Sequence, residues 1–305
     1  MSEAKARVGF IGLGTIGEPM ATNIAKKGFE VTVFDLDQRK IAKLLEQGAK
    51  SAATPAGVAE RSDVVVTMVP EPTDVEKAAL GAGGIIEGLR QGGLYIDMST
   101  SDPTMTRKIG AELAKKGIAM VDAPVARTVE NAWQGTLSIM TGGEPADVER
   151  AMPVLRCMGD TFTYCGPLGN AHAMKLVNNF TSAGVMSLLC ESLTMGVKAG
   201  LELETIIKVV QGTFAGTRQL GEVFPVKPLA GDFSPGFFTR LSRKDQRLAL
   251  GLAKAMGVDT PVGRGVFEAL DKTCAAGFET EDFSSVLRVR EAEAGIKVRL
   301  PGGKP

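Results

Sequence analysis

The sequence predicts an α/β fold: a Rossmann-type N-terminal domain, a long interdomain helix and an all-α C-terminal domain. Short apolar runs alternate with amphipathic segments through the first half, which is typical of a doubly wound parallel sheet. A glycine-rich turn follows the first apolar run. After residues 166–169, a proline-free stretch is followed by helical segments alone. We therefore expect a nucleotide-binding domain over residues 1–167 and helical structure over 168–305.

The first strand, Val8–Ile11, breaks into glycines at 12, 14 and 17, and apolar residues then resume at helical spacing. The G-x-G-x-x-G pattern alone is weak, because 37 of the 305 residues are glycine. Strand, turn, helix, second strand and acid in this order are far more specific for a dinucleotide. The residues expected to bind the pyrophosphate are Gly12, Leu13, Gly14, Thr15, Ile16 and Gly17.

The second strand, Val31–Phe34, ends on Asp35. A carboxylate there accepts hydrogen bonds from the ribose hydroxyls of NAD and repels the 2′-phosphate of NADP. Nearby Arg39 leaves some use of NADP open. The alternative is that Asp35 or Asp37 only caps the following helix. We expect NADH to be the cofactor, with NADP less favoured.

The remaining elements follow from periodicity and end signals. Further strands are predicted at 64–68, 94–97, 119–122, 137–141 and 161–165, and helices at 18–27, 38–46 and 102–116. In the second half, helices are predicted at 170–199, 203–213, 243–256, 260–276 and 284–294, without a convincing strand. A long helix followed by a helical domain also suggests a homodimer or homotetramer.

Composition narrows the function. The formal net charge is zero, so there is no basic footprint for nucleic acid. No continuous apolar run reaches the roughly 18 residues of a membrane helix, and the first residues lack a secretory core. The four cysteines show no C-x-x-C spacing, which favours reduced thiols over a disulfide frame or a zinc site. We expect a cytoplasmic protein without nucleic-acid, membrane or metal partners.

Ligands of open parallel sheets bind at the carboxyl ends of the strands. Val69 and Pro70 follow one predicted strand, and Ser99 and Thr100 follow the next. We expect Val69, Pro70 and Thr100 to flank the nicotinamide. Turn and cap chemistry explains the same residues equally well.

His172 is the single histidine, so a histidine acid or a zinc centre has little material here. The predicted helix from residue 170 instead carries Lys175, Asn178 and Asn179 on one side. A lysine can donate a proton to the alkoxide formed by hydride transfer, and Lys244 is a candidate neighbouring cation. The alternative is a solvated lysine beside asparagines that cap a kink.

Arg127 follows a predicted strand end, and Thr128 follows it. A guanidinium at this position can bind an anionic group through paired hydrogen bonds. A surface arginine is the plainer interpretation.

The chain resembles the β-hydroxyacid dehydrogenases, of the 3-hydroxyisobutyrate dehydrogenase type, over nearly its whole length. The matching segments are residues 9–21, 97–103, 122–125 with 135–143, 169–179 and 243–250. The resemblance implies that Lys175 is the general acid or base and that Asn179 positions the substrate or the lysine. It also implies that Thr100 and Lys244 border the substrate and the nicotinamide.

One departure concerns the substrate. Most of the family has Ser-Gly-Gly where this chain has Ala126, Arg127 and Thr128. The segment is similar to a subgroup with Gly-Arg-Thr that holds a sulfonate, which implies that Arg127, Thr128 and Asn178 bind a small sulfonated aldehyde. A sulfonate stays ionised and suits a forked cation with hydroxyl and amide donors. The alternatives are succinic semialdehyde or another carboxylate semialdehyde, and a non-catalytic nucleotide-binding module. Imine reducers usually lack the lysine.

Overall fold

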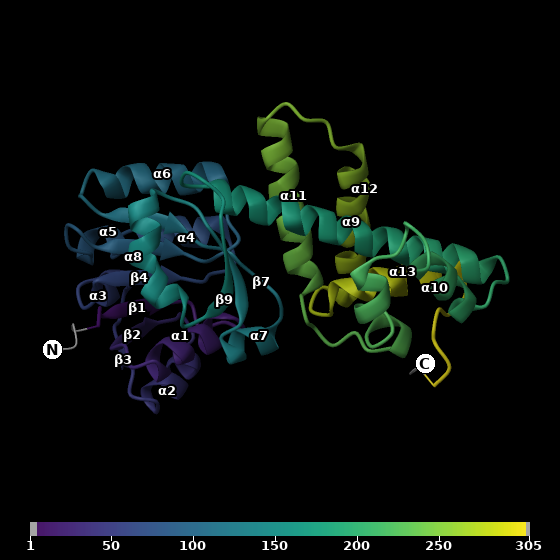
Figure 1. Cartoon of the computed structure of the whole chain (residues 1–305), viewed down its shortest axis with the longest axis horizontal. Helices are drawn as coiled ribbons and strands as arrows, with labels where there is room; N and C mark the ends of the chain where they lie inside the picture. The colour runs from purple at the N-terminus through teal and green to yellow at the C-terminus, as the bar shows by residue number, and fades with distance from the viewer. Residues whose placement is uncertain (1–4, 303–305) are drawn as a thin grey trace. The chain divides into compact units, whose positions relative to one another are not determined.

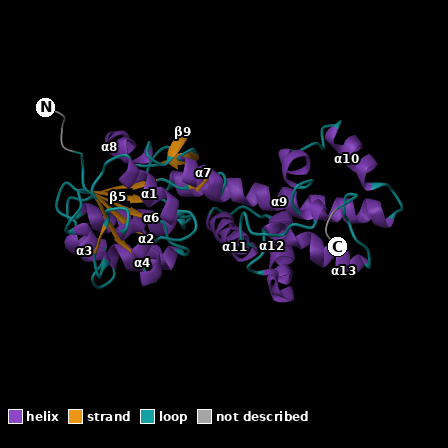
Figure 2. Cartoon of the chain, turned by 90° about the horizontal axis from the view of Figure 1, so that it is seen from below, coloured by secondary structure: helices purple, strands orange, loops and turns teal. Residues whose placement is uncertain are grey.

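The computed structural model describes residues 5–302. The chain forms two compact units that divide after Lys175. The N-terminal unit holds the strands, coloured orange in Figure 2, and the C-terminal unit is helical (Figures 1 and 2). The α/β class and the all-helical second half are as predicted.

The N-terminal unit is built on a six-stranded parallel sheet of order β3-β2-β1-β4-β5-β6. Its strands are β1 (Val8–Ile11), β2 (Val31–Phe34), β3 (Lys50–Ser51), β4 (Val64–Thr67), β5 (Leu94–Asp97) and β6 (Ala119–Asp122). The order reverses between β1 and β4, which is the switch point where a Rossmann sheet binds its ligand.

Apolar side chains cover both faces of this sheet. Along β1, Phe10 packs into one core cluster and Ile11 into another, because successive side chains of a strand point to opposite faces. The helices that follow the strands are α1 (Gly17–Lys26), α2 (Gln38–Leu45), α3 (Pro55–Ala59), α4 (Pro72–Leu80), α5 (Ile85–Gly88) and α6 (Pro103–Ala114). Asp102 caps α6 by accepting the Thr104 N–H, with Pro103 at its first position, as the sequence predicts.

A second sheet completes this unit. It has the order β7-β8-β9, with β7 (Val125–Ala126), β8 (Leu137–Thr141) and β9 (Gly159–Tyr164), and it carries α7 (Val129–Gln134) and α8 (Pro145–Leu155). The predicted start of β9 at Thr161 was wrong by two residues. Gly159 and Asp160 are not apolar, so the hydrophobic pattern did not include them. They belong to the strand because Gly159 pairs with Leu137 of β8.

The C-terminal unit packs around apolar residues of its helices, such as Leu193, Leu270 and Leu287. Its main helices are α9 (Asn170–Lys198, which begins in the N-terminal unit), α10 (Leu203–Gln211), α11 (Thr239–Ala255), α12 (Pro261–Thr273) and α13 (Val286–Ala294). Helix α11 begins four residues before its predicted start at 243. The Thr239 hydroxyl donates to backbone carbonyls near residue 282, a tertiary contact that helical periodicity does not reveal.

Helix α9 is long and apolar enough to cross a membrane by length and composition alone, with a mean hydropathy of 1.3 in its most apolar window. In the structure, 44 % of that window is buried inside the protein. A buried core helix passes the same test, so the composition of α9 is weak support for a membrane span. The sequence shows no continuous apolar run of this length, because polar residues interrupt the helix at several positions.

Candidate active site

The turn after β1 holds three glycines, of which two are required by close backbone contacts within the protein and one is not. At Gly12, where φ is +95°, a Cβ would lie 2.3 Å from the Met68 carbonyl oxygen. At Gly17 a Cβ would lie 2.0 Å from the Gly12 carbonyl oxygen. At Gly14 it would meet nothing within 4 Å. The open space at Gly14, beside an α1 N-terminus without a side-chain cap, fits the pyrophosphate of a dinucleotide.

Asp35 lies at the end of β2, next to this turn. Its carboxylate accepts the Leu13 N–H at 2.7 Å and the Asp37 N–H at 2.8 Å, and the Lys40 ammonium lies 3.6 Å away. The cap of α2 is Asp37, which accepts the Arg39 N–H. The capping alternative is thus confirmed for Asp37 and wrong for Asp35, whose carboxylate joins the glycine turn to the end of β2.

Arg39 is held by Asp37. Its guanidinium donates to both carboxylate oxygens of Asp37, at 2.9 and 2.8 Å. Hydrogen bonds from the Arg39 side chain lower the pKa of Asp37 to about 2, and the same pair raises the pKa of Arg39. Asp37 thus neutralises Arg39, the first cation after Asp35 in the sequence.

The loops after β4 and β5 are tied together. The Val69 N–H donates to Ser99 Oγ at 3.0 Å, and the Ser99 N–H donates to Asp97 Oδ1 at 3.1 Å. Strands β4 and β5 are paired in register up to Thr67 and Asp97. The predicted contacts Val69, Pro70 and Thr100 therefore stand on adjacent strand ends of one sheet.

Arg127 follows β7 and has an unusual backbone. Its φ of 85° is the one positive value at a non-glycine position within residues 5–302. Its guanidinium donates to the Thr136 carbonyl oxygen, to Asp160 at 2.7 Å and to Thr161 at 2.8 Å. The side chain is 37 % exposed. An incoming anion would share this guanidinium with Asp160, a partner that sequence reasoning missed.

Thr128 lies beside Arg127 and caps the short helix α7. Its hydroxyl donates to Asn131 Oδ1 at 2.9 Å and accepts the Asn131 N–H at 3.4 Å. Ala126 is the last residue of β7 and pairs with Ser138 of β8. The structure thus brings Ala126, Arg127 and Thr128 to one end of the small sheet.

Three other predicted residues meet in the C-terminal unit. Asn178 Nδ2 donates to Asn179 Oδ1 at 3.0 Å, and Asn179 Nδ2 donates to Asp245 Oδ2 at 2.6 Å. The Lys244 ammonium lies 3.1 Å from Asp245 Oδ1, and both side chains are buried. Sequence reasoning missed Asp245, because adjacent residues of a helix are not expected to face one another and burial of the pair cannot be read from the sequence.

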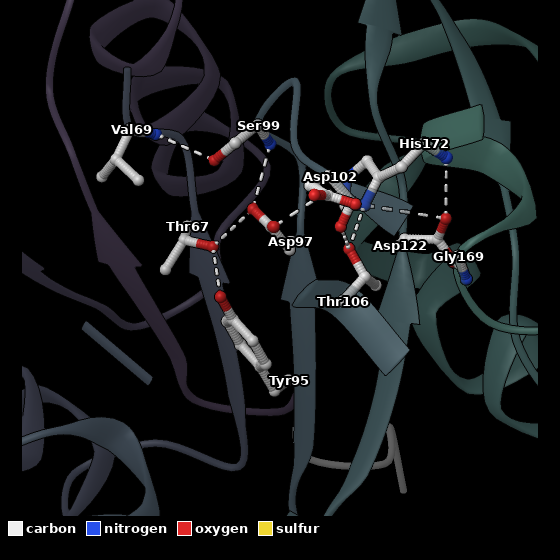
Figure 3. Close-up of polar contacts among 10 residues, drawn as sticks. All are labelled: Thr67, Val69, Tyr95, Asp97, Ser99, Asp102, Thr106, Asp122, Gly169 and His172. Atoms are coloured by element: carbon white, nitrogen blue, oxygen red, sulfur yellow. Dashed lines mark hydrogen bonds and ion pairs between the residues drawn. The ribbon is translucent and has the colours of Figure 1, made fainter. Parts of the chain in front are cut away.

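Lys175 stands in the first turns of α9, at the end of the N-terminal unit, and is half-buried. His172 lies one turn before it and is fully buried. Figure 3 shows the group around this histidine, which includes Asp97, Thr106 and Asp122. No sequence pattern marked these three residues as parts of one cluster.

Comparisons with known proteins cover both units. A family model described as the NAD binding domain of 6-phosphogluconate dehydrogenase matches residues 7–166. A second, described as the NAD-binding domain of NADP-dependent 3-hydroxyisobutyrate dehydrogenase, matches residues 169–290.

Curated relatives span nearly all of the chain. A 3-sulfolactaldehyde reductase of Escherichia coli is 36 % identical, over 97 % of this chain and 99 % of its own. A 2-(hydroxymethyl)glutarate dehydrogenase of Eubacterium barkeri is 36 % identical over 97 % and 98 %. Among solved structures, 3-hydroxyisobutyrate dehydrogenase of Mycobacterium tuberculosis with L-serine has a TM-score of 0.87, at 29 % identity over 94 % and 99 %.

Proposed function

Since the chain belongs to the β-hydroxyacid dehydrogenase family and is an NAD(P)-dependent oxidoreductase, we propose that it reduces 3-sulfolactaldehyde to 2,3-dihydroxypropane-1-sulfonate with NADH. The proposed substrate rests on the guanidinium of Arg127, a residue whose backbone is strained. A left-handed conformation costs a non-glycine residue of order 1 kcal/mol, and such strain is common at functional sites.

NADH supplies the hydride when it is bound. The residues that hold it in this proposal are those of the glycine turn from Gly12 to Gly17, with Asp35 on the adenosine ribose. Val69, Pro70 and Thr100 border the nicotinamide side. NADH is preferred because Asp35 repels a 2′-phosphate and Arg39 is occupied by Asp37.

Lys175 donates the proton in this proposal. The ammonium protonates the aldehyde oxygen as hydride arrives at the carbonyl carbon, so that no alkoxide is released. Asn179 orients the substrate or the lysine, and its amide is itself held by Asp245 at 2.6 Å. Lys244 borders the same site in this proposal.

The sulfonate is anchored by Arg127, Thr128 and Asn178, with Ala126 beside them. A guanidinium offers two parallel N–H donors to two oxygens of an anion. Binding requires that the substrate shares the guanidinium with Asp160 or displaces it. The Thr128 hydroxyl exchanges its bond to Asn131 for one to the third oxygen.

Steady-state kinetics test the substrate. We expect kcat/KM for sulfolactaldehyde to exceed that for succinic, tartronate and methylmalonate semialdehydes by at least tenfold, about 1.4 kcal/mol. A carboxylate semialdehyde that wins by this factor overturns the proposal.

A carboxylate substrate is the second candidate. The Eubacterium relative, named for a dicarboxylate, is 36 % identical to this chain, the same percentage as the 3-sulfolactaldehyde reductase. Arg127 would then bind a carboxylate in the same forked geometry. Oxidation of 2-(hydroxymethyl)glutarate with NAD, measured beside 2,3-dihydroxypropane-1-sulfonate, separates the two.

We also propose that the enzyme is a cytoplasmic homodimer or homotetramer without nucleic-acid or membrane partners. Leu188 and Met195 are 64 and 70 % exposed and lie two turns apart on α9. An apolar stripe of this kind on a long helix suits a second copy of the chain. Light scattering that returns the monomer mass, or recovery in the membrane fraction of a lysate, would contradict this.

A further inference from the structure

A buried polar network lies in the N-terminal unit, where β5 and β6 end. Asp97 and Asp122 are register partners on these neighbouring strands. Their side chains and that of His172 are 0 % exposed. Buried carboxylates destabilise a fold unless they are hydrogen-bonded or paired, so each atom of this group needs a partner.

Asp122 caps the first turn of α9. Its Oδ1 accepts the Gly169 N–H and its Oδ2 accepts the His172 N–H, both at 2.8 Å. Such N–H groups lack acceptors within their own helix, and a negative charge also favours this end of the helix dipole. Glycine at position 142 provides the space for this carboxylate, because a Cβ there would lie 2.5 Å from Asp122 Oδ1. A side chain of β6 therefore fixes the start of α9 to the sheet.

His172 links this cap to β5. Thr106 Oγ1 donates its one proton to the Asp102 carbonyl oxygen, so His172 Nδ1 is the donor in its 2.7 Å contact with Thr106. The other ring nitrogen, Nε2, faces Asp97 Oδ2 at 3.8 Å. Neither atom has a hydrogen-bond partner within the part of the chain that the structure describes.

Asp97 carries the network to the predicted cofactor loops. Its Oδ1 accepts from Thr67 Oγ1 at 2.9 Å and from the Ser99 N–H, and Ser99 Oγ accepts the Val69 N–H. Burial raises the pKa of Tyr95 well above its usual value, and its hydroxyl is the donor to Thr67 Oγ1. The chain of contacts from Val69 to Gly169 can be followed in Figure 3.

We propose that Asp122, His172 and Asp97 are positioning residues, which fix the turn carrying Lys175 relative to the loop that borders the nicotinamide. This inference rests on the proposed role of Lys175 as proton donor. Lys175 follows His172 by three residues, so the two stand on consecutive turns of one face. A displacement of about 1 Å in such a group lowers a rate up to 100-fold.

The variant Asp122→Asn tests the cap. Asparagine keeps the size, but its one oxygen satisfies only one N–H, and its own amide N–H groups face the other donor. We expect kcat to fall at least tenfold while the Kd of NADH changes less than twofold. The primary isotope effect with NADH deuterated at C4 should rise, because the chemical step becomes slower. The matched control is Asp232→Asn in the C-terminal unit, which alters a carboxylate that accepts the Ser234 N–H outside this network and should keep kcat.

His172→Asn gives a second readout if Asp122→Asn does not fold. Its amide keeps a donor for Thr106 but loses the contact with Asp97, so we expect a smaller loss of kcat with the same rise in isotope effect. All assays use the aldehyde that the wild-type enzyme reduces fastest. Folded variants that lose thermal stability but keep the wild-type kcat and isotope effect overturn the inference.

Lys175→Met separates this inference from the proposed function. If it keeps kcat, Lys175 is not the proton donor, and the positioning inference fails with that role, while the substrate is still decided by the steady-state kinetics. If it is inactive while Asp122→Asn and His172→Asn behave as wild type, the positioning role alone fails.

Discussion

The guanidinium of Arg127 donates hydrogen bonds to Asp160 and Thr161, while its backbone adopts a left-handed conformation that favours glycine. If this strain serves anion binding, Arg127→Lys should lower kcat/KM at least tenfold, mainly through KM, because an ammonium cannot bind two oxygens in parallel. Arg127→Gly should lose more activity yet gain stability of order 1 kcal/mol. Kinetics and thermal unfolding on the same preparations measure both effects.

The control for this change is Arg150→Lys on α8, where the guanidinium pairs with Asp147 in the same unit. It should leave kcat/KM unchanged. Equal kinetics of the Arg127→Lys variant and the wild type would show that Arg127 serves only its contacts with Thr136, Asp160 and Thr161.

Asp37 decides how available Arg39 is for a 2′-phosphate. Asp37→Ala should free the guanidinium and lower the KM for NADPH several-fold, while the KM for NADH changes little. The double variant Asp37→Ala/Arg39→Ala should return to the wild-type preference. An unchanged ratio of the two kcat/KM values in the single variant would contradict this role.

At the level of elements, Asp63 ties the start of β4 to the start of β1. It accepts the Arg7 N–H and the guanidinium groups of Arg7 and Arg90 at 2.8–2.9 Å. Hydrogen bonds from Arg7 lower its pKa from 3.8 to about 2. A depressed carboxyl pKa stabilises the fold above the unfolded pKa, and this stabilisation is lost as pH falls toward 2.

Asp63→Asn should therefore unfold more easily at pH 7, by about 1 kcal/mol because the arginines are partly exposed. The difference should shrink between pH 4 and pH 2. Urea unfolding of both proteins at these pH values measures it, and a difference that stays constant down to pH 2 would rule out the charge as its cause.

The elements show where sequence reasoning succeeds. Strands such as β1, β2, β5 and β6 are short apolar runs between turns, and their bounds were predicted correctly. The partners of the site residues were not, because they come from distant segments. Asp122 meets the N–H of a residue 50 positions later, and Arg127 meets Asp160 33 positions later. Periodicity places a residue on a strand end but does not say which carboxylate will be buried against it.

At the level of the whole molecule, the two units have separate hydrophobic cores. Each unit contains a buried free cysteine whose labelling measures the opening of that unit. These are Cys157 in the N-terminal unit and Cys190 in the helical one. Burial raises the pKa of both thiols, so alkylation requires opening of the structure. Saturating NADH should slow the labelling of Cys157 more than that of Cys190, because it binds the N-terminal unit.

Mass spectrometry of labelled peptides over time measures this difference. AMP is a suitable control ligand, since it offers only half of the dinucleotide and should protect Cys157 less. Equal protection of the two thiols by NADH would mean that both units open as one.

The empty space around Gly14 separates two kinds of natural selection. Gly12 and Gly17 are constrained by backbone atoms of the protein itself, so a mutation there is removed as a folding defect, whatever the enzyme does. Position 14 has no such neighbour. A lineage that abandoned the dinucleotide could change this residue while the domain stayed intact, which would make position 14 the first place where loss of the chemistry is recorded.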